Sequence, residues 1–170
     1  NSGNVDTCNF FVTVIDVDSP TLSNCPPDTV LNNDSSLCGA VFVYALPSAM
    51  DNCGSILTPV QIDTTGYMSN DLFPVGTTQL VYAVTDSAGN SDTCSFTITV
   101  NDVESPVLSC AADTTIFNNT DSCGAFFNYP TPMANDNCDT SLTIVQIDTS
   151  GYVSGDLFPV GATEIVYAVS

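Results

Sequence analysis

The chain contains no lysine, arginine, histidine or tryptophan, while its 19 aspartate and glutamate residues give a formal net charge of −19. Binding to nucleic acids depends on Lys and Arg, which displace counterions from phosphates, and docking on anionic membranes depends on basic clusters. The composition therefore argues against both classes of partner. Repulsion among so many uncompensated carboxylates also destabilises a compact state unless cations bind or salt screens the charges.

The same absences remove most catalytic chemistry. Histidine and lysine bases are not available, and neither a Ser–His–Asp nor a Cys–His arrangement can be built. Pairs of carboxylates alone can hydrolyse glycosides, but the acidic residues fall in turns and linkers rather than around an expected cleft. We expect a protein that is not an enzyme.

No apolar run approaches the ~20 residues that cross a bilayer, and we expect no membrane insertion. Eight cysteines stand at well-separated positions, without CxxC pairs or a histidine that could share a zinc site. This usage is typical of disulfides formed in an oxidising compartment. The sequence reads as a mature, processed segment of an extracellular or cell-surface protein.

Hydrophobic residues make up 44% of the chain and follow the periodicity of strands, so we expect it to fold despite its charge. Turn-forming clusters separate the apolar runs, and no segment combines helix caps with a 3.6-residue apolar stripe. The expected strands are 39–46, 57–63, 78–85 and 94–102. The spacing predicts that the following apolar residues face a β-sandwich core: Val41, Val43, Leu80, Tyr82, Val84, Phe96, Ile98 and Val100.

Residues 24–85 and 109–170 are two copies of one repeat, in which Cys25, Cys38 and Cys53 recur 85 residues later as Cys110, Cys123 and Cys138. The first copy is followed by DSAGNSDTCSFTITVNDVESP, and the similar NSGNVDTCNFFVTVIDVDSP opens the chain. We therefore expect the head of one copy to complete the tail of another, as in an array or filament. Two interpretations remain open: one window on a long continuous tandem chain, or a separate subunit that donates its first strand.

The run FPVGTTQLVYAVTDSAGNSDTCSFTITVNDVESP, with Cys25-Pro26 and the CGA…DNC segment, resembles the hyalin-repeat (HYR) family. The resemblance covers nearly the whole chain once the split unit is rejoined. It implies immunoglobulin-like modules of extracellular adhesion and matrix proteins, arranged in tandem, associated with calcium and not enzymes. This chain departs from the pattern at Ala111-Ala112, which replace prolines, and in lacking basic residues. The expected parts are a strand and linker at 1–18, a sandwich at 19–104, and a second sandwich at 105–170 without its final strand.

Disulfide pairing follows from the expected strand order of a seven-stranded sandwich. Cys25 opens the first strand region and Cys94 the last, whereas Cys38 and Cys53 flank one strand and its loop. Eight cysteines allow 105 pairings, and a bond between Cys8 and Cys110 within one chain stays an alternative. The expected pairs are Cys25–Cys94, Cys38–Cys53, Cys123–Cys138, and Cys110 with Cys8 of the next copy.

The linkers carry acids in a repeated pattern, Asp16 and Asp18 in VIDVDSP and Asp102 and Glu104 in VNDVESP. In the expected topology the first linker lies at the same pole as two polar loops, and oxygen ligands from a linker and two loops suit calcium, which takes six to eight oxygens. Solvated surface carboxylates are the plain alternative, because no segment matches an EF-hand loop. The loop ligands expected at the first joint are Asp51, Asn52, Asp86, Asn90 and Asp92; those at the second are Asn135 and Asp136, with Asn1 and Asn4 of the next copy.

Two N-x-S/T sequons, at Asn33 and Asn118, stand at equivalent positions in polar turns, where a glycan would face solvent. Chance sequons are common in a chain this rich in Asn, Ser and Thr. Glycosylation is therefore a hypothesis for both positions.

These patterns predict an all-β protein of tandem immunoglobulin-like β-sandwiches that forms a filament, a pilus-like fibre or a long adhesin. Head-to-tail copies of the chain are the expected partners, with a cell-surface or glycan ligand as a further one. The head strand Cys8 to Val14 would complete the second sandwich of a neighbouring copy. Two other functions stay open: a carbohydrate- or protein-binding accessory module of a large secreted enzyme, and a calcium-storing or biomineral-binding matrix protein.

Overall fold

The computed structural model describes residues 2–54 and 56–170, and within these ranges it contains strands and no helix. The all-β prediction is therefore confirmed. None of the described residues forms a helix long and apolar enough to cross a membrane. The chain divides into two compact units, one of residues 1–30 and 41–99 and the other of residues 31–40 and 100–170.

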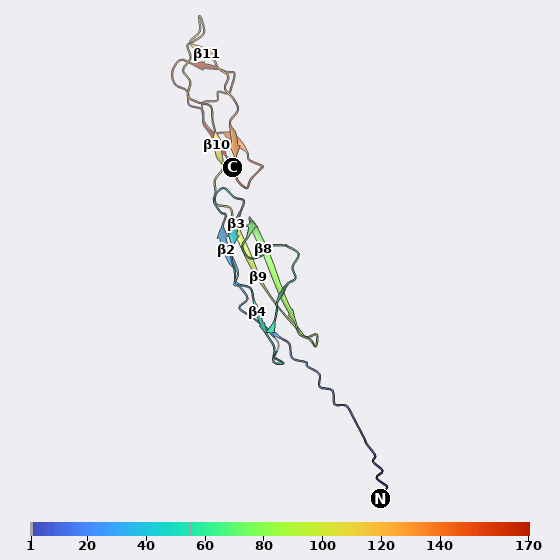
Figure 1. The fold of residues 1–170 in the computed structure, drawn as a ribbon. Coiled ribbons are helices and arrows are strands. Elements are labelled where there is room, and N and C mark those ends of the chain that lie inside the picture. The colour runs from blue at the N-terminus through green and yellow to red at the C-terminus, as the bar shows by residue number, and fades with distance from the viewer. Residues whose placement is uncertain (1, 55) are drawn as a thin grey trace. The chain divides into compact units, whose positions relative to one another are not determined.

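The largest sheet has four strands in the order β2-β9-β8-β6, so that β9 lies between β2 and β8 (Figure 1). These strands are β2 (Thr29–Asn32), β6 (Val60–Gln61), β8 (Gly76–Thr85) and β9 (Ser91–Asn101). The same part of the sequence also forms a three-stranded sheet, β1-β4-β5, and the pair β3-β7. Their bounds are β1 (Thr21–Ser23), β3 (Gly39–Phe42), β4 (Ser48–Met50), β5 (Ile56–Leu57) and β7 (Asp71–Pro74).

The core of the first unit comes from the alternation of β8 and β9. From Thr78 to Val84 in β8 and from Phe96 to Val100 in β9, every second residue is buried, which is the period of a sheet with one covered face. The largest fully buried side chains are Phe73, Phe96, Leu80, Ile98 and Val100. Burying such a side chain contributes about 1.5–3 kcal/mol relative to leaving it in water.

Tyr44 closes this core from the segment after β3. Its ring meets the edge of Phe96, with centroids 5.1 Å apart, and its hydroxyl lies 3.0 Å from the hydroxyl of Tyr82. Burial, followed by the bond to Tyr82, raises the pKa of Tyr44. Because Ala40 and Tyr44 are buried, the even-numbered residues from 40 to 44 face the core and the odd-numbered ones between them face away from it.

The prediction that Val41 and Val43 face the core is therefore wrong, since both side chains are exposed. The sequence GAVFVYAL alternates equally well in either phase, and the inward phase belongs to the small Ala40 and the aromatic Tyr44. The other expected core residues, on β8 and β9, are confirmed.

The second unit repeats the turns but forms shorter strands. It contains three antiparallel pairs, β10-β12, β11-β14 and β13-β15. In both repeats the FPVG turn holds its glycine at positive φ, 111° at Gly76 and 122° at Gly161, as expected for this residue. The strands are β10 (Val107–Ser109), β11 (Gly124–Phe126), β12 (Met133–Asn135), β13 (Ile144–Gln146), β14 (Leu157–Pro159) and β15 (Tyr167–Val169).

One aspartate in each repeat ties a loop to the following strand. Asp63 accepts hydrogen bonds from the backbone N–H groups of Thr65 and Val81, and Asp148 does the same for Ser150 and Val166. Burial opposes the charge on Asp63, but these bonds outweigh it and lower its pKa. Hydrogen bonds from Ser150 and Val166 lower the pKa of Asp148.

Two disulfides form among the described residues, and the first is the predicted Cys25–Cys94 bond. The second joins Cys38 to Cys138, so the predicted pairs Cys38–Cys53 and Cys123–Cys138 are wrong. The reason is that the turn before Cys38 lies within the second unit, where Asn137 donates to the carbonyl of Leu37. Cys8, Cys53, Cys110 and Cys123 are exposed free thiols.

Candidate functional site

An acidic cluster lies at one pole of the first unit, where the entering linker meets two loops. Ligand atoms of Asp16, Asp51 and Cys53 lie within 4.8 Å of one another. Asn52 donates to Asp18, and the Nδ2 of Asn90 donates to the backbone carbonyl of Asp16 over 3.3 Å. The linker and both loops therefore converge, as the sequence predicted. We call this group of residues the acidic pole.

Asp51 is the residue of the acidic pole whose bonding is incomplete. One of its carboxylate oxygens, Oδ2, accepts from the backbone of Cys53, while Oδ1 is buried and has no hydrogen-bond partner. A buried acceptor without a partner costs free energy. A hydrogen bond with Asp16, then burial, raises the pKa of the Cys53 thiol.

Other predicted ligands of this joint are committed to local bonds. The Asp86 carboxylate accepts from the backbone of Ala88 and from both the backbone and the side chain of Asn90, closing its own loop. Burial opposes the charge on Asp86, but these bonds prevail and lower its pKa. Asp92 accepts from the backbone of Leu22 and so holds β1. Among the predicted ligands of this joint, the carboxylates of Asp16 and Asp51 are the pair brought within 4.8 Å of each other. Carboxylate oxygens are ligands that suit a hard cation such as calcium.

The second predicted ligand set does not gather into such a group among residues 2–54 and 56–170. Glu104 instead binds the turn before Cys38, accepting from the backbone of Ser36 and the side chains of Ser35 and Asn33. Asp136 accepts from the backbone of Asp139 and Cys138, which lowers its pKa. Asp102 accepts from the backbone of Glu104. Asn1, another member of the predicted set, lies outside the described residues.

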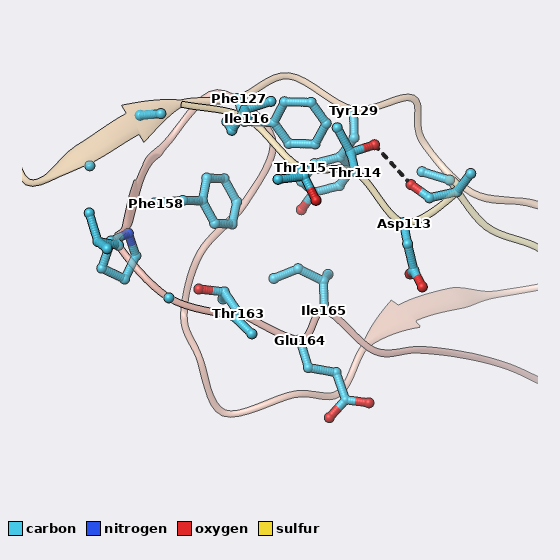
Figure 2. Close-up of a pocket in the computed structure, with 18 of the residues that line it drawn as sticks. Asp113, Thr114, Thr115, Ile116, Phe127, Tyr129, Phe158, Thr163, Glu164 and Ile165 are labelled. Carbon is cyan, nitrogen blue, oxygen red and sulfur yellow. Dashed lines mark hydrogen bonds between the residues drawn. The ribbon is translucent and has the colours of Figure 1, made fainter. Parts of the chain in front are cut away.

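The second unit contains an open groove of about 850 Å³. Figure 2 shows Phe158 and Ile165 extending into this space, with Ile116 and Phe127 along its edge. Its walls come from residues within 110–118, 124–132 and 158–167. Most of the lining side chains are apolar or aromatic, with threonines, Asp113 and Glu164 among them. We call it the core groove, because its lining corresponds to the core of the first unit.

The correspondence is residue by residue at the 85-residue offset. Phe73, Leu80 and Tyr82 are buried in the first unit, whereas their counterparts Phe158, Ile165 and Tyr167 are partly exposed. Residues 114–117, which correspond to β2, form no strand, and the counterpart of the ten-residue β8 is reduced to β15. No described strand of the second unit takes the place that β9 has between β2 and β8.

The segment before the first linker is the counterpart of β9. CNFFVTVIDVDSP (8–20) aligns with CSFTITVNDVESP (94–106), so that Phe10, Val12 and Val14 match the buried Phe96, Ile98 and Val100. In the structure, residues 2–20 form no strand (Figure 1). The side chains of Phe10, Val12 and Val14 are 83%, 78% and 90% exposed. We call residues 8–14 the head segment. Isolated exposed apolar residues are ordinary, but a run of them marks a binding surface.

The two sequon asparagines differ in their surroundings. Asn33 is buried, its Nδ2 donates to Leu37 and Glu104, and its Oδ1 accepts from Val103. A glycan at this nitrogen would displace those bonds. Asn118 is exposed, although its Nδ2 donates to Asn119 and Ser122. Glycosylation stays a prediction, and the exposed position suits it better.

The sequence model of the HYR domain matches residues 15–100 and 101–170. Hyalin of Lytechinus variegatus is 30% identical over 172 residues, which cover 98% of this chain and 31% of hyalin. Hyalin of Strongylocentrotus purpuratus is 30% identical over 175 residues, covering all of this chain and 14% of that protein. "Sushi, von Willebrand factor type A, EGF and pentraxin domain-containing protein 1" of Rattus norvegicus is 33% identical over 156 residues, 91% of this chain.

The chain spans 31% or less of the length of each of these relatives. No solved structure matches it. Like these relatives, the protein is extracellular or lies at the cell surface.

Proposed function

The chain belongs to the HYR domain family, and from that premise we propose that it is a structural and adhesive module that joins further copies of itself into a fibre or a long adhesin. The joining step is strand sharing: the head segment of one copy enters the core groove of another. The role is mechanical and involves no catalysis.

One observation carries the proposal, namely that an open groove and an exposed apolar segment occur in the same chain and match each other. The groove exposes the counterparts of Phe73, Leu80 and Tyr82, which are buried in the first unit. The head segment carries the counterparts of the inward residues of β9 and exposes them to water. Each partner therefore presents the apolar surface that the other lacks.

The register of the shared strand follows from the first unit. Phe96 packs on Tyr44 and Tyr82, with ring centroids 5.1 and 6.4 Å away. Phe10 would accordingly pack on Tyr129 and Tyr167, which both line the groove. Val12 and Val14 would follow along the same face, and Phe11 and Thr13 would face the other way, as Thr97 and Thr99 do. Main-chain hydrogen bonds to two neighbouring strands would add to this burial, as in other cases of strand addition.

We also propose that the acidic pole binds calcium. The orphaned Oδ1 of Asp51 supports this, since a cation would supply the partner that the protein does not. Asp16 and Asp18 would contribute further oxygens from the linker, and a bound cation would reduce the repulsion in a chain of net charge −19. A linker tied to two loops in this way would resist bending.

The test of strand sharing uses light scattering coupled to size exclusion. The full chain should form oligomers that grow with concentration, and a chain without residues 1–14 should remain monomeric. Val12→Asp, which places a charge in the groove, should prevent assembly, while the matched control Thr13→Asp should assemble. Assembly that survives both the deletion and Val12→Asp would refute strand sharing.

A further inference from the structure

We propose that each junction between copies carries a second disulfide, between Cys123 of one copy and Cys53 of the next, beside the predicted bond of Cys110 to Cys8. The proposal rests on the proposed end-to-end assembly and identifies chemistry that fixes it. The starting observation is the Cys38–Cys138 disulfide, which the structure contains in place of the predicted Cys38–Cys53 and Cys123–Cys138 bonds.

The Cys38–Cys138 bond joins a residue of the first sequence repeat to a residue of the second, with Cα atoms 4.7 Å apart. Its two ends belong to different positions of the repeat. Cys38 recurs 85 residues later as Cys123, and Cys138 occurs 85 residues earlier as Cys53. The bond therefore links one position of a repeat to another position of the repeat that follows. Applied to the next junction, the same rule links Cys123 to Cys53 of the following copy.

The turn that would receive Cys53 has the same geometry as the turn that holds Cys38. Around Cys38, Asn33 Nδ2 donates to the Leu37 carbonyl, and Asp34 N donates to the Gly39 carbonyl. Around Cys123, Asn118 Nδ2 donates to the Ser122 carbonyl, and Asn119 N donates to the Gly124 carbonyl. Ser36 and Asp121, at the same position of the two turns, both adopt positive φ, 62° and 60°.

The loop that would supply Cys53 also repeats its counterpart. Asp51 accepts from the backbone of Cys53 just as Asp136 accepts from the backbone of Cys138. Asn52 corresponds to Asn137, whose side chain donates to Leu37 beside the existing bond. The turn around Cys123 and the loop around Cys53 thus already have the hydrogen bonds of the turn and loop that the Cys38–Cys138 bond joins, and both thiols are exposed.

The rule also accounts for every cysteine of the chain. Cys25–Cys94 and Cys38–Cys138 are formed within it. The four free cysteines, Cys8, Cys53, Cys110 and Cys123, are the unmatched members of the same two kinds of pair. Each junction then needs two bonds, Cys110–Cys8 and Cys123–Cys53, and no thiol is left over.

The chemistry is thiol–disulfide exchange with a small-molecule or protein disulfide as the oxidant. One thiol loses its proton, and its thiolate attacks a sulfur of the oxidant, forming a mixed disulfide and releasing one thiol. The thiolate of the second cysteine then displaces the remaining sulfur. Cys53 and Cys123 together lose two protons and two electrons, and the oxidant becomes two thiols.

The test uses the full 170-residue chain with Cys8→Ser and Cys110→Ser, so that only the second junction disulfide can form between copies. Equal amounts of ¹⁵N-labelled and unlabelled chain are oxidised with oxidised glutathione, digested without reductant and analysed by mass spectrometry. The proposal predicts a peptide pair that contains Cys53 and Cys123 and mixes the two labels. Pairs that never mix labels would come from bonds within one chain and would overturn the proposal.

Two single variants in the same background complete the test. Chains with Cys53→Ser or with Cys123→Ser should form no covalent dimer alone, but a mixture of the two should form a heterodimer and nothing longer. Assembly by light scattering without any Cys53–Cys123 peptide would refute the disulfide and leave strand sharing intact. If nothing assembles under any condition, both proposals are wrong.

Discussion

Phe10→Ala tests the register of the shared strand more sharply than any other substitution in the head segment. Phe96, its counterpart, is 1% exposed and packs on two tyrosines. Truncating a buried phenylalanine to alanine costs about 3–5 kcal/mol, and the lower value is appropriate where one side of the groove can relax. Since about 1.4 kcal/mol is a tenfold change in affinity, the Kd should rise by roughly 100-fold.

The assay isolates one binding event. A fluorescent peptide of residues 5–15, with Cys8→Ser to prevent cross-linking, is titrated with a chain that lacks residues 1–14, and anisotropy gives the Kd. The matched control is Phe11→Ala, which removes the same side chain from the neighbouring position. Phe11 corresponds to Thr97 on the opposite side of β9, so this change should alter the Kd by less than about fivefold. A larger loss for Phe11→Ala than for Phe10→Ala would show that the register is wrong.

Three further predictions concern the first unit. Calcium at 100 times its Kd should stabilise that unit by about 2.7 kcal/mol, so that its Tm is higher in calcium than in a chelator. Asp51→Asn should remove this difference in Tm, whereas Asp113→Asn, at an exposed acid outside the acidic pole, should keep it. Equal Tm values with and without chelator in the unmodified chain would exclude the site. Asp63→Asn should lower the free energy of unfolding near neutral pH. Folding lowers the pKa of Asp63 below its ordinary 3.8, so its charge stabilises the fold above pH 3.8, and this contribution is lost as the pH falls through the lowered pKa. The stabilities of the unmodified chain and the variant should therefore converge in acid, and a difference independent of pH would contradict this. Replacing Cys25 and Cys94 together by serine removes a disulfide between positions 69 residues apart. The free energy of unfolding, measured by calorimetry, should fall by about 4 kcal/mol. A fall below about 1 kcal/mol would refute a stabilising role of this disulfide.

The parts of the fold that could be predicted from the sequence depend on short-range pattern. Alternation placed Leu80 and Phe96 in the core, because polar residues such as Thr77, Gln79, Thr97 and Thr99 stand at the alternate positions of β8 and β9. Val41 and Val43 were misplaced because both faces of that strand are apolar, so that the phase depends on the contacts of Tyr44 with Phe96 and Tyr82. Local alternation contains no information about such contacts.

The candidate site divides in the same way. Convergence of Asp16 with Asp51 could be predicted by counting strands, since this fixes which loops share a pole. The self-contained loop of Asp86 and the binding of Glu104 to the turn before Cys38 could not, because they depend on backbone N–H groups that any residue supplies. The same turn decides the partner of Cys38. Its repetition around Cys123 was visible in the sequence, but its meaning needed the observed bond.

Hydrogen exchange on assembled and monomeric protein tests strand sharing most directly. In the monomer the backbone amides of the head segment are exposed and should exchange freely. On assembly, amides of residues 9–14 should become protected together with those of residues 115–117 and 162–166, which would flank the inserted strand in the core groove. If the chain assembles while residues 9–14 still exchange as they do in the monomer, copies are joined by some other surface and the account is wrong.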